Sequence, residues 1–134
     1  FVGDGPYSTA LAEALPEAKF LGYRTGEKLA TIYASADIFV FPSTTDTFGN
    51  VVIEAQASGL PVIVSDLGGP KELVEHGVDG LITAALDATK FAEAIRGLVE
   101  NRELRTQMSR NARKRVNDRS WPEAFQKFWA ATER

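Results

Sequence analysis

The chain has 134 residues, of which 44% are hydrophobic and 25% charged, so it fits one domain that buries about two-thirds of its unfolded surface. No cysteine is present, which excludes disulfides and thiolate metal sites, and no apolar run approaches the roughly 18 residues that a membrane span requires. The net charge is −3: residues 1–67 have 3 basic and 8 acidic side chains, and residues 68–134 have 12 basic and 10 acidic ones. This distribution disfavours a nucleic-acid partner. A soluble, cytoplasmic protein is expected.

Short apolar runs alternate with amphipathic segments over residues 1–83. Strands that are buried on both faces of a parallel sheet are continuously apolar, and these runs have that character. The sequence therefore predicts an α/β fold, in which helices cover both faces of a parallel sheet and the crossovers are right-handed. The predicted strands are Lys19–Leu21, Ile38–Phe41, Pro61–Val64 and Leu81–Ile82, and the predicted helices are Tyr7–Leu15, Glu27–Ser35, Asn50–Ala57 and Pro70–Glu75.

From Asp87 onward the apolar spacing is that of helices only. One apolar stripe consists of Phe91, Ile95, Leu98 and Val99, and a second begins with Leu104 and Met108 on a helix that ends near Asn117. A last helix is predicted over Pro122–Thr132, with Ser120 as its N-cap and an apolar stripe of Trp121, Phe125, Phe128 and Trp129.

Two carboxylates, Asp46 and Glu54, bracket the start of the predicted helix Asn50–Ala57. The intervening Thr47-Phe48-Gly49 is typical of a tight turn whose glycine allows a close backbone approach. A helix start offers free N–H groups and the positive end of the helix dipole to an anion. The pattern therefore predicts a phosphate ligand with hydroxyl-rich groups on both sides.

Each of these residues also has a plainer interpretation. Glu54 has apolar neighbours along the chain, where a carboxylate is costly unless it is bonded, but it can also be an exposed helix acid. Asp46 can be a turn acid that accepts from the N–H groups of Phe48 or Gly49, and Phe48 can simply pack in the core.

Other features carry weaker signals. Gly3-Asp4-Gly5-Pro6 lacks the third glycine of a dinucleotide fingerprint, and Pro6 removes an N–H that a phosphate would use. Gly68-Gly69-Pro70 is expected to turn into a helix, with backbone contact to the ligand as a second role. The loop around His76, the only histidine, is expected to be structural, with no metal or catalytic role. The basic run 110–119 would attract anionic lipid beside a membrane, and a solvated helix face is the alternative.

The stretch from Pro42 to Val74 resembles the donor-binding half of retaining glycosyltransferases with two Rossmann-like domains, the GT-B fold (family 4-like, group 1). The family has two acids separated by seven residues, which Asp46 and Glu54 match, although the first is usually Glu. The motif continues with Ser58-Gly59-Leu60-Pro61-Val62 and Gly68-Gly69-Pro70-Lys71-Glu72. The resemblance runs from Phe1 to Trp121, so residues 1–134 would be the C-terminal nucleotide-sugar-binding domain.

This resemblance implies a hexosyltransferase that moves a hexose, with retention, from a nucleoside diphosphate sugar (UDP- or GDP-hexose) to a glycan or lipid acceptor. The turn 45–52 is similar to that of branches that transfer mannose or a related hexose. Asp46 would be the catalytic residue that orients the transferred sugar. The implied substrate-binding residues are Glu54 on the ribose hydroxyls, Phe48, Gly49, Asn50 and Val51 through their backbone N–H groups, and Tyr23 and Arg24 beside the base. No cofactor or metal is implied.

The family pattern also implies parts beyond this chain. Phe1-Val2-Gly3 resembles the end of a strand, and the unit before it would carry an Arg and a Lys for the donor diphosphate. An N-terminal acceptor domain would be the partner, so the 134 residues alone are expected to be inactive, and peripheral membrane contact is part of this expectation. Two other classes stay open, a non-catalytic nucleotide-binding module and one half of a sugar-nucleotide epimerase.

Overall fold

The computed structural model describes residues 1–117 and divides the chain into two compact units, Phe1–Ile32 and Tyr33–Arg134. Helix α2 (Gly26–Ala34) begins in the first unit and ends in the second. The helix predicted over Pro122–Thr132 lies outside the described residues. The two units are therefore described one at a time.

The first unit holds α1 (Ser8–Ala14) between two extended segments. Leu21 N donates to Phe1 O and Gly3 N donates to Gly22 O, both at 2.9 Å, and the rings of Phe1 and Phe20 stack with centroids 4.8 Å apart. These bonds pair the two segments, but residues 19–21 do not form the predicted strand. The pairing stops at Gly3 and Gly22, which both have positive φ values of 114° and 64°.

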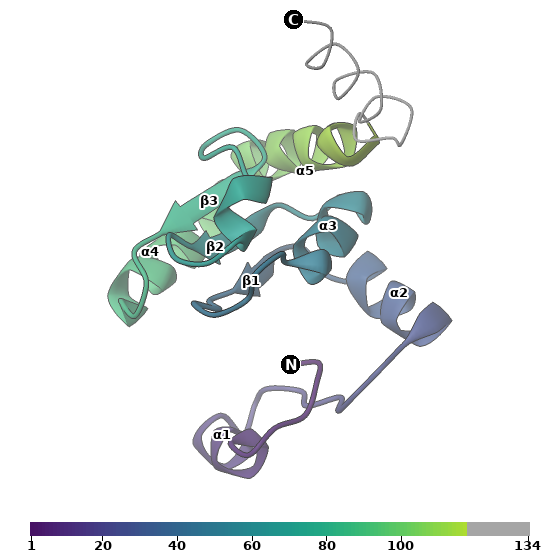
Figure 1. The fold of residues 1–134 in the computed structure, drawn as a ribbon, viewed down its shortest axis with the longest axis vertical. Helices are drawn as coiled ribbons and strands as arrows, with labels where there is room; N and C mark the ends of the chain where they lie inside the picture. The colour runs from purple at the N-terminus through teal and green to yellow at the C-terminus, as the bar shows by residue number, and fades with distance from the viewer. Residues whose placement is uncertain (118–134) are drawn as a thin grey trace, which may run out of the picture. The chain divides into compact units, whose positions relative to one another are not determined.

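The second unit is built on a parallel sheet of β1 (Phe39–Phe41), β2 (Val62–Ser65) and β3 (Gly80–Thr83), in that order (Figure 1). Every residue of the central β2 is buried, which is what its unbroken apolar run predicts. The α/β prediction is confirmed, with helices around a parallel sheet. All three strands run in the same direction, so their carboxyl ends lie at one edge of the sheet.

Helix α3 (Asn50–Ala57) connects β1 to β2 with the predicted bounds, and α4 (Ala88–Glu100) and α5 (Arg102–Asn117) follow β3. Ile63 of β2 packs with Leu98 of α4 and Met108 of α5 in the core. The side chain of Asp87 caps α4 by accepting from Lys90 N. The prediction of an apolar stripe on α4 is wrong at one position, because the side chain of Val99 is 59% exposed.

The helix predicted over Pro70–Glu75 is only the 3₁₀ turn η1 (Pro70–Leu73). It ends because Val74 is extended, with φ −119° and ψ 132°, and because Glu75 N donates to the Asp79 side chain instead of to a helical carbonyl. Leu73 and Val74 are buried, so this segment is held by packing and not by helix propensity.

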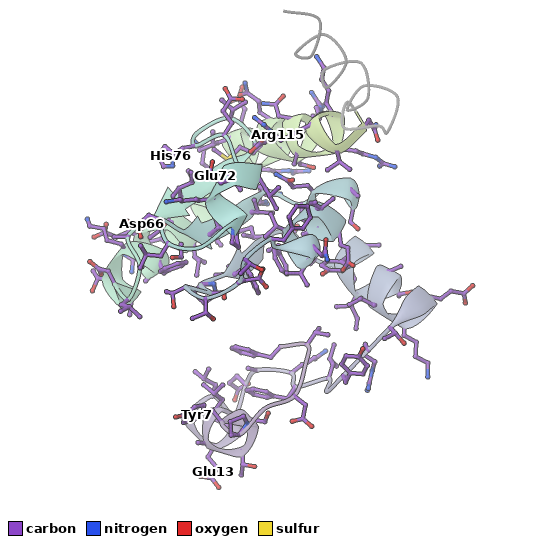
Figure 2. The ribbon with its side chains drawn as sticks, in the orientation of Figure 1. Tyr7, Glu13, Asp66, Glu72, His76 and Arg115 are labelled. Carbon is purple, nitrogen blue, oxygen red and sulfur yellow. The ribbon has the colours of Figure 1, made fainter. Side chains whose placement is uncertain are left out.

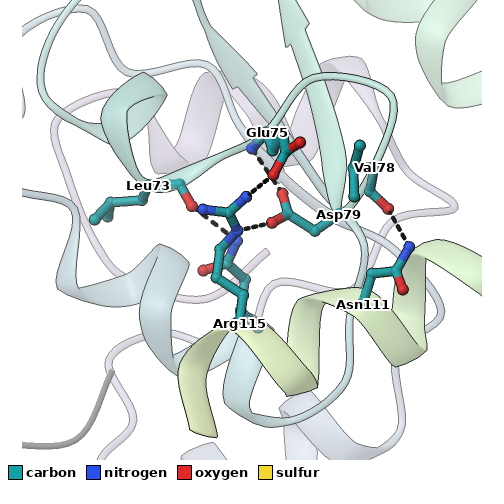
Figure 3. Close-up of polar contacts among 7 residues, drawn as sticks. Leu73, Glu75, Val78, Asp79, Asn111 and Arg115 are labelled. Carbon is teal, nitrogen blue, oxygen red and sulfur yellow. Dashed lines mark hydrogen bonds and ion pairs between the residues drawn. The ribbon is translucent and has the colours of Figure 1, made fainter. Parts of the chain in front are cut away.

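An ion pair with a buried aspartate ties the loop after η1 to α5 (Figure 3). Asp79 is 1% exposed, and Arg115 donates to it and to Glu75. Asn111 also donates to Val78 O at 2.9 Å, and His76 Nδ1 accepts from Ile82 N at 2.9 Å. The predicted structural character of this loop is confirmed, since its one histidine serves as a backbone acceptor.

Removing the cation of this pair should destabilise the second unit. Arg115→Met leaves the carboxylate of Asp79 buried without its partner, and we expect the free energy of unfolding to fall by about 3–5 kcal/mol. Urea unfolding followed by circular dichroism measures the loss. Arg113→Met, at an exposed position of the same helix, is the control and should change stability by less than about 0.5 kcal/mol.

In the double variant Asp79→Asn/Arg115→Met, the amide oxygen can still accept from Glu75 N but carries no charge. This variant should regain much of the lost stability. An Arg115→Met loss no larger than that of Arg113→Met would show that the pair contributes nothing.

Candidate functional site

Three loops meet at the carboxyl edge of the sheet, one after each strand, and they are bonded to one another. Asp66 follows β2 (Figure 2); its N donates to Thr83 O at 2.9 Å and its Oδ1 accepts from Ala85 N at 2.8 Å. Gly69 N donates to Asp46 O at 2.9 Å and so joins the loop after β2 to the loop after β1. In open parallel sheets, ligands bind outside this edge.

The contact between the first two loops is closer than any side chain would allow. A Cβ atom at Gly69 would lie 1.9 Å from Thr47 O, and one at Gly68 would lie 2.9 Å from Asp46 O. Gly69 has an ordinary φ of −74°, so it is glycine for lack of space and not for backbone conformation. The expected turn at Gly68-Gly69-Pro70 is thus also a packing surface for the Asp46 turn.

The carboxylate of Asp46 is held by its own turn. Its Oδ1 accepts from Phe48 N at 3.0 Å and from Gly49 N at 2.6 Å, and its backbone N donates to Ser43 Oγ at 3.2 Å. This is the geometry of a turn acid, the plainer of the two interpretations. Within residues 1–117, Oδ2 of Asp46 accepts no hydrogen bond, so the catalytic role stays a prediction.

Helix α3 begins with two N–H donors that no acceptor in residues 1–117 bonds. Gly49 precedes it in the left-handed conformation, with φ 82° and ψ 46°, and provides no side-chain cap. A Cβ atom there would lie 3.1 Å from Pro70 Cγ, so protein fills that side of Gly49. Asn50 N and Val51 N find no acceptor in the described part of the chain. Phe48 is 58% exposed, which contradicts the alternative that it packs in the core.

Glu54 lies on the exposed side of α3, because Val52 and Ala55 occupy the buried side. Its apolar neighbours in the sequence thus do not surround it. Its Oε2 accepts from the hydroxyl of Tyr33 at 3.2 Å. Burial, together with the nearby charge of Glu54 and this hydrogen bond, raises the pKa of Tyr33 to about 12. The hydroxyl therefore stays protonated, and remains a donor, throughout the neutral range.

Tyr23 and Arg24 belong to the first unit. Tyr23 is 75% exposed, and the guanidinium of Arg24 donates to Tyr23 O at 2.9 Å. Their predicted place beside the base stays a prediction.

Two other features are absent from residues 1–117. Nowhere in these residues do three His, Cys, Asp or Glu side chains come together so that they could hold a metal ion. None of the helices in this range has the length and apolar character that a membrane span needs.

The sequence patterns do not predict the residues that support the two acids or that join the loops after β2 and β3. Tyr33 is one of them, and a signal for it exists: a tyrosine on the apolar side of a helix needs a partner for its hydroxyl. Asp66 and Ser43 gave no such signal, because short polar residues in loops are common and their partners depend on the tertiary structure.

Comparison with known proteins identifies similar chains. The family model described as glycosyl transferases group 1 matches residues 1–115. A GDP-mannose-dependent alpha-mannosyltransferase of Corynebacterium glutamicum is 40% identical over 90% of this chain and 29% of its own length. The sulfoquinovosyl transferase SQD2 of Arabidopsis thaliana is 35% identical over 96% of this chain and 26% of its own. The chain thus spans less than a third of either relative.

Solved structures share the fold. HepE of Anabaena, crystallised with UDP, superposes with a TM-score of 0.81 and 29% identity over 98% of this chain and 39% of its own. A sucrose-phosphate synthase of Thermosynechococcus elongatus gives a TM-score of 0.80 and 28% identity over 97% of this chain and 38% of its own. The Rossmann-like interpretation of the sheet is confirmed by these structures.

The contact at Gly69 can be tested by adding one methyl group. Gly69→Ala forces the loops after β1 and β2 apart, and we expect it to lower the free energy of unfolding by about 1–3 kcal/mol. Gly97→Ala is the matched control, because a Cβ atom in this helical position of α4 meets nothing within 4 Å. It should raise stability by about 0.5–1 kcal/mol. Equal and small effects in urea unfolding would contradict the tight contact.

Proposed function

Because the chain belongs to the glycosyl transferases of group 1, we propose that it forms the donor-binding domain of a hexosyltransferase with the GT-B fold. The donor is a nucleoside diphosphate sugar, and the acceptor is a glycan or lipid. The name of the mannosyltransferase relatives and the UDP and UDP-glucose complexes of HepE support this donor class. They differ in the base, so UDP- and GDP-hexoses are both candidates.

One observation carries the proposal: the start of α3 presents two unused N–H groups between two carboxylates at the carboxyl edge of the sheet. Asn50 N and Val51 N have no acceptor within residues 1–117, whereas Phe48 N and Gly49 N are already bonded to Asp46. A diphosphate satisfies the free donors and gains from the positive end of the helix dipole. The start of α3 thus stabilises the charge of the diphosphate.

The ribose lies along α3 from the diphosphate. Glu54 is four residues beyond Asn50, about 6 Å along the helix axis, and its carboxylate can accept from the two ribose hydroxyls. The carboxylate of Glu54 is exposed, as such a role requires, because the ribose hydroxyls must reach it.

The transferred hexose lies on the opposite side of the diphosphate, at Asp46. Oδ1 of this acid is fixed by the N–H groups of Phe48 and Gly49, and Oδ2 is left to accept from a sugar hydroxyl. Asp46 therefore orients the anomeric carbon for transfer with retention, while the acceptor comes from an N-terminal domain of the complete enzyme. A positioned sugar and a stabilised diphosphate are both large terms in catalysis.

The ribose contact predicts the effect of Glu54→Ala. In the protein expressed from its complete reading frame, binding of UDP or GDP should weaken by about 1.5–3 kcal/mol, because hydrogen bonds to a charged group are lost. Calorimetric titration measures this change, and Glu103→Ala on the exposed face of α5 is the control. Unchanged affinity in a folded Glu54→Ala protein would refute the ribose assignment.

The sugar contact predicts a different pattern for Asp46→Asn. The amide oxygen can still accept from Phe48 N and Gly49 N, so the turn is kept while the charge is lost. We expect kcat to fall at least about 100-fold, with the affinity for bare nucleotide nearly unchanged. Asp46→Ala should also lower stability, because it removes the acceptor of the turn. Parallel loss of bare nucleotide and turnover in Asp46→Asn would contradict a contact confined to the sugar.

A further inference from the structure

We propose that Tyr33 is a positioning residue that holds the carboxylate of Glu54 in the orientation that accepts the two ribose hydroxyls. The inference rests on the proposed function for the role of Glu54, and on the structure for everything else. Tyr33 does not touch the nucleotide in this proposal. It acts through one hydrogen bond from the end of α2 to the middle of α3.

The hydroxyl of Tyr33 is well placed for this task. It donates to Glu54 Oε2 at 3.2 Å and lies 3.4 Å from Val51 O, the carbonyl one turn earlier in α3. The residue is 8% exposed, and its ring packs against Phe39 of β1 with centroids 5.8 Å apart. The donor is thus fixed by the sheet and not by a flexible loop.

Glu54 needs such a partner because no other group within residues 1–117 bonds its carboxylate on the exposed side of α3. The structure gives its carboxylate no other hydrogen bond within residues 1–117, and a glutamate side chain turns about three bonds. Binding a ribose diol requires both carboxylate oxygens to face it at once. A side chain that is ordered before binding loses less entropy when the ligand arrives.

The hydrogen bonds that Tyr33 and Glu54 can form also allow this role. A tyrosine hydroxyl has one proton to donate, and each carboxylate oxygen can accept more than one bond. Oε2 can therefore keep the bond from Tyr33 and still accept from one ribose hydroxyl, while Oε1 accepts from the other. The raised pKa of Tyr33 keeps its proton in place, so the hydroxyl does not become an anion that would repel Glu54.

The test separates the positioning of Glu54 from a general structural role. Tyr33→Phe removes only the hydroxyl and keeps the ring against Phe39. With the protein from the complete reading frame, UDP and GDP should bind about 3- to 10-fold more weakly. Their 2′,3′-dideoxy counterparts, which offer Glu54 no hydroxyls, should bind to Tyr33→Phe and to the unmodified protein equally. Tyr7→Phe, at a 75% exposed position, is the control.

A double-mutant cycle gives the second readout. In a Glu54→Ala background, Tyr33→Phe should cause no further loss of nucleotide affinity, because the residue through which it acts is gone. Equal weakening of the ribo- and dideoxynucleotides, or an additive loss in the double variant, would overturn the inference in favour of a structural role. Unchanged affinity in Tyr33→Phe would overturn it as well.

Failure of the proposed function looks different in the same experiment. If the unmodified protein binds neither UDP nor GDP, or if Glu54→Ala leaves their affinity unchanged, the ribose assignment fails and the positioning role fails with it. If Glu54→Ala weakens binding and Tyr33→Phe does not, the ribose assignment stands and only the role of Tyr33 is wrong.

Discussion

The site depends on a backbone contact that leaves no space for a side chain. Gly68 and Gly69 lie directly against the carbonyls of Asp46 and Thr47, and Gly69 N donates to Asp46 O. This contact fixes the turn after β1 from outside, while the carboxylate of Asp46 fixes it from inside. The start of α3 follows that turn directly. Gly68 and Gly69, in the loop after β2, therefore help to set the position of the N–H groups at the start of α3, which follows the loop after β1.

The same turn explains why some donors are free and others are not. The first N–H groups of a helix have no partner within it, and a polar residue at the N-cap usually satisfies one of them. Here the N-cap is Gly49, which has no side chain, and the nearest acid bonds the two N–H groups before the helix. Within residues 1–117, the donors of Asn50 and Val51 have no acceptor, so solvent or a ligand can bond them. The Asp46 turn thus uses the N–H groups of Phe48 and Gly49, which precede the helix, and not the first two donors of the helix itself.

Local patterns in the sequence predicted the elements well where one interaction dominates. The bounds of α3 and the burial of β2 follow from apolar spacing and from the glycine before the helix. Predictions failed where a tertiary partner decides the outcome. The sequence predicts Glu75 to be helical, but its N–H donates to the Asp79 side chain and the helix ends before it. Glu54 has apolar neighbours in the sequence, but its carboxylate accepts a hydrogen bond from Tyr33. The sequence alone does not identify these bonds, because Tyr33 lies in another helix and Asp79 lies further along the loop that follows η1.

The aspartate at position 46 has a physical consequence of its own. The family resemblance leads us to expect glutamate there, and aspartate is one methylene shorter. A short carboxylate can bond N–H groups two and three residues ahead, which Oδ1 of Asp46 does with Phe48 and Gly49. A glutamate reaches further, but its extra rotatable bond makes that compact turn harder to hold. Asp46 therefore has a shorter reach than glutamate would have, and its carboxylate gains a fixed position within the turn.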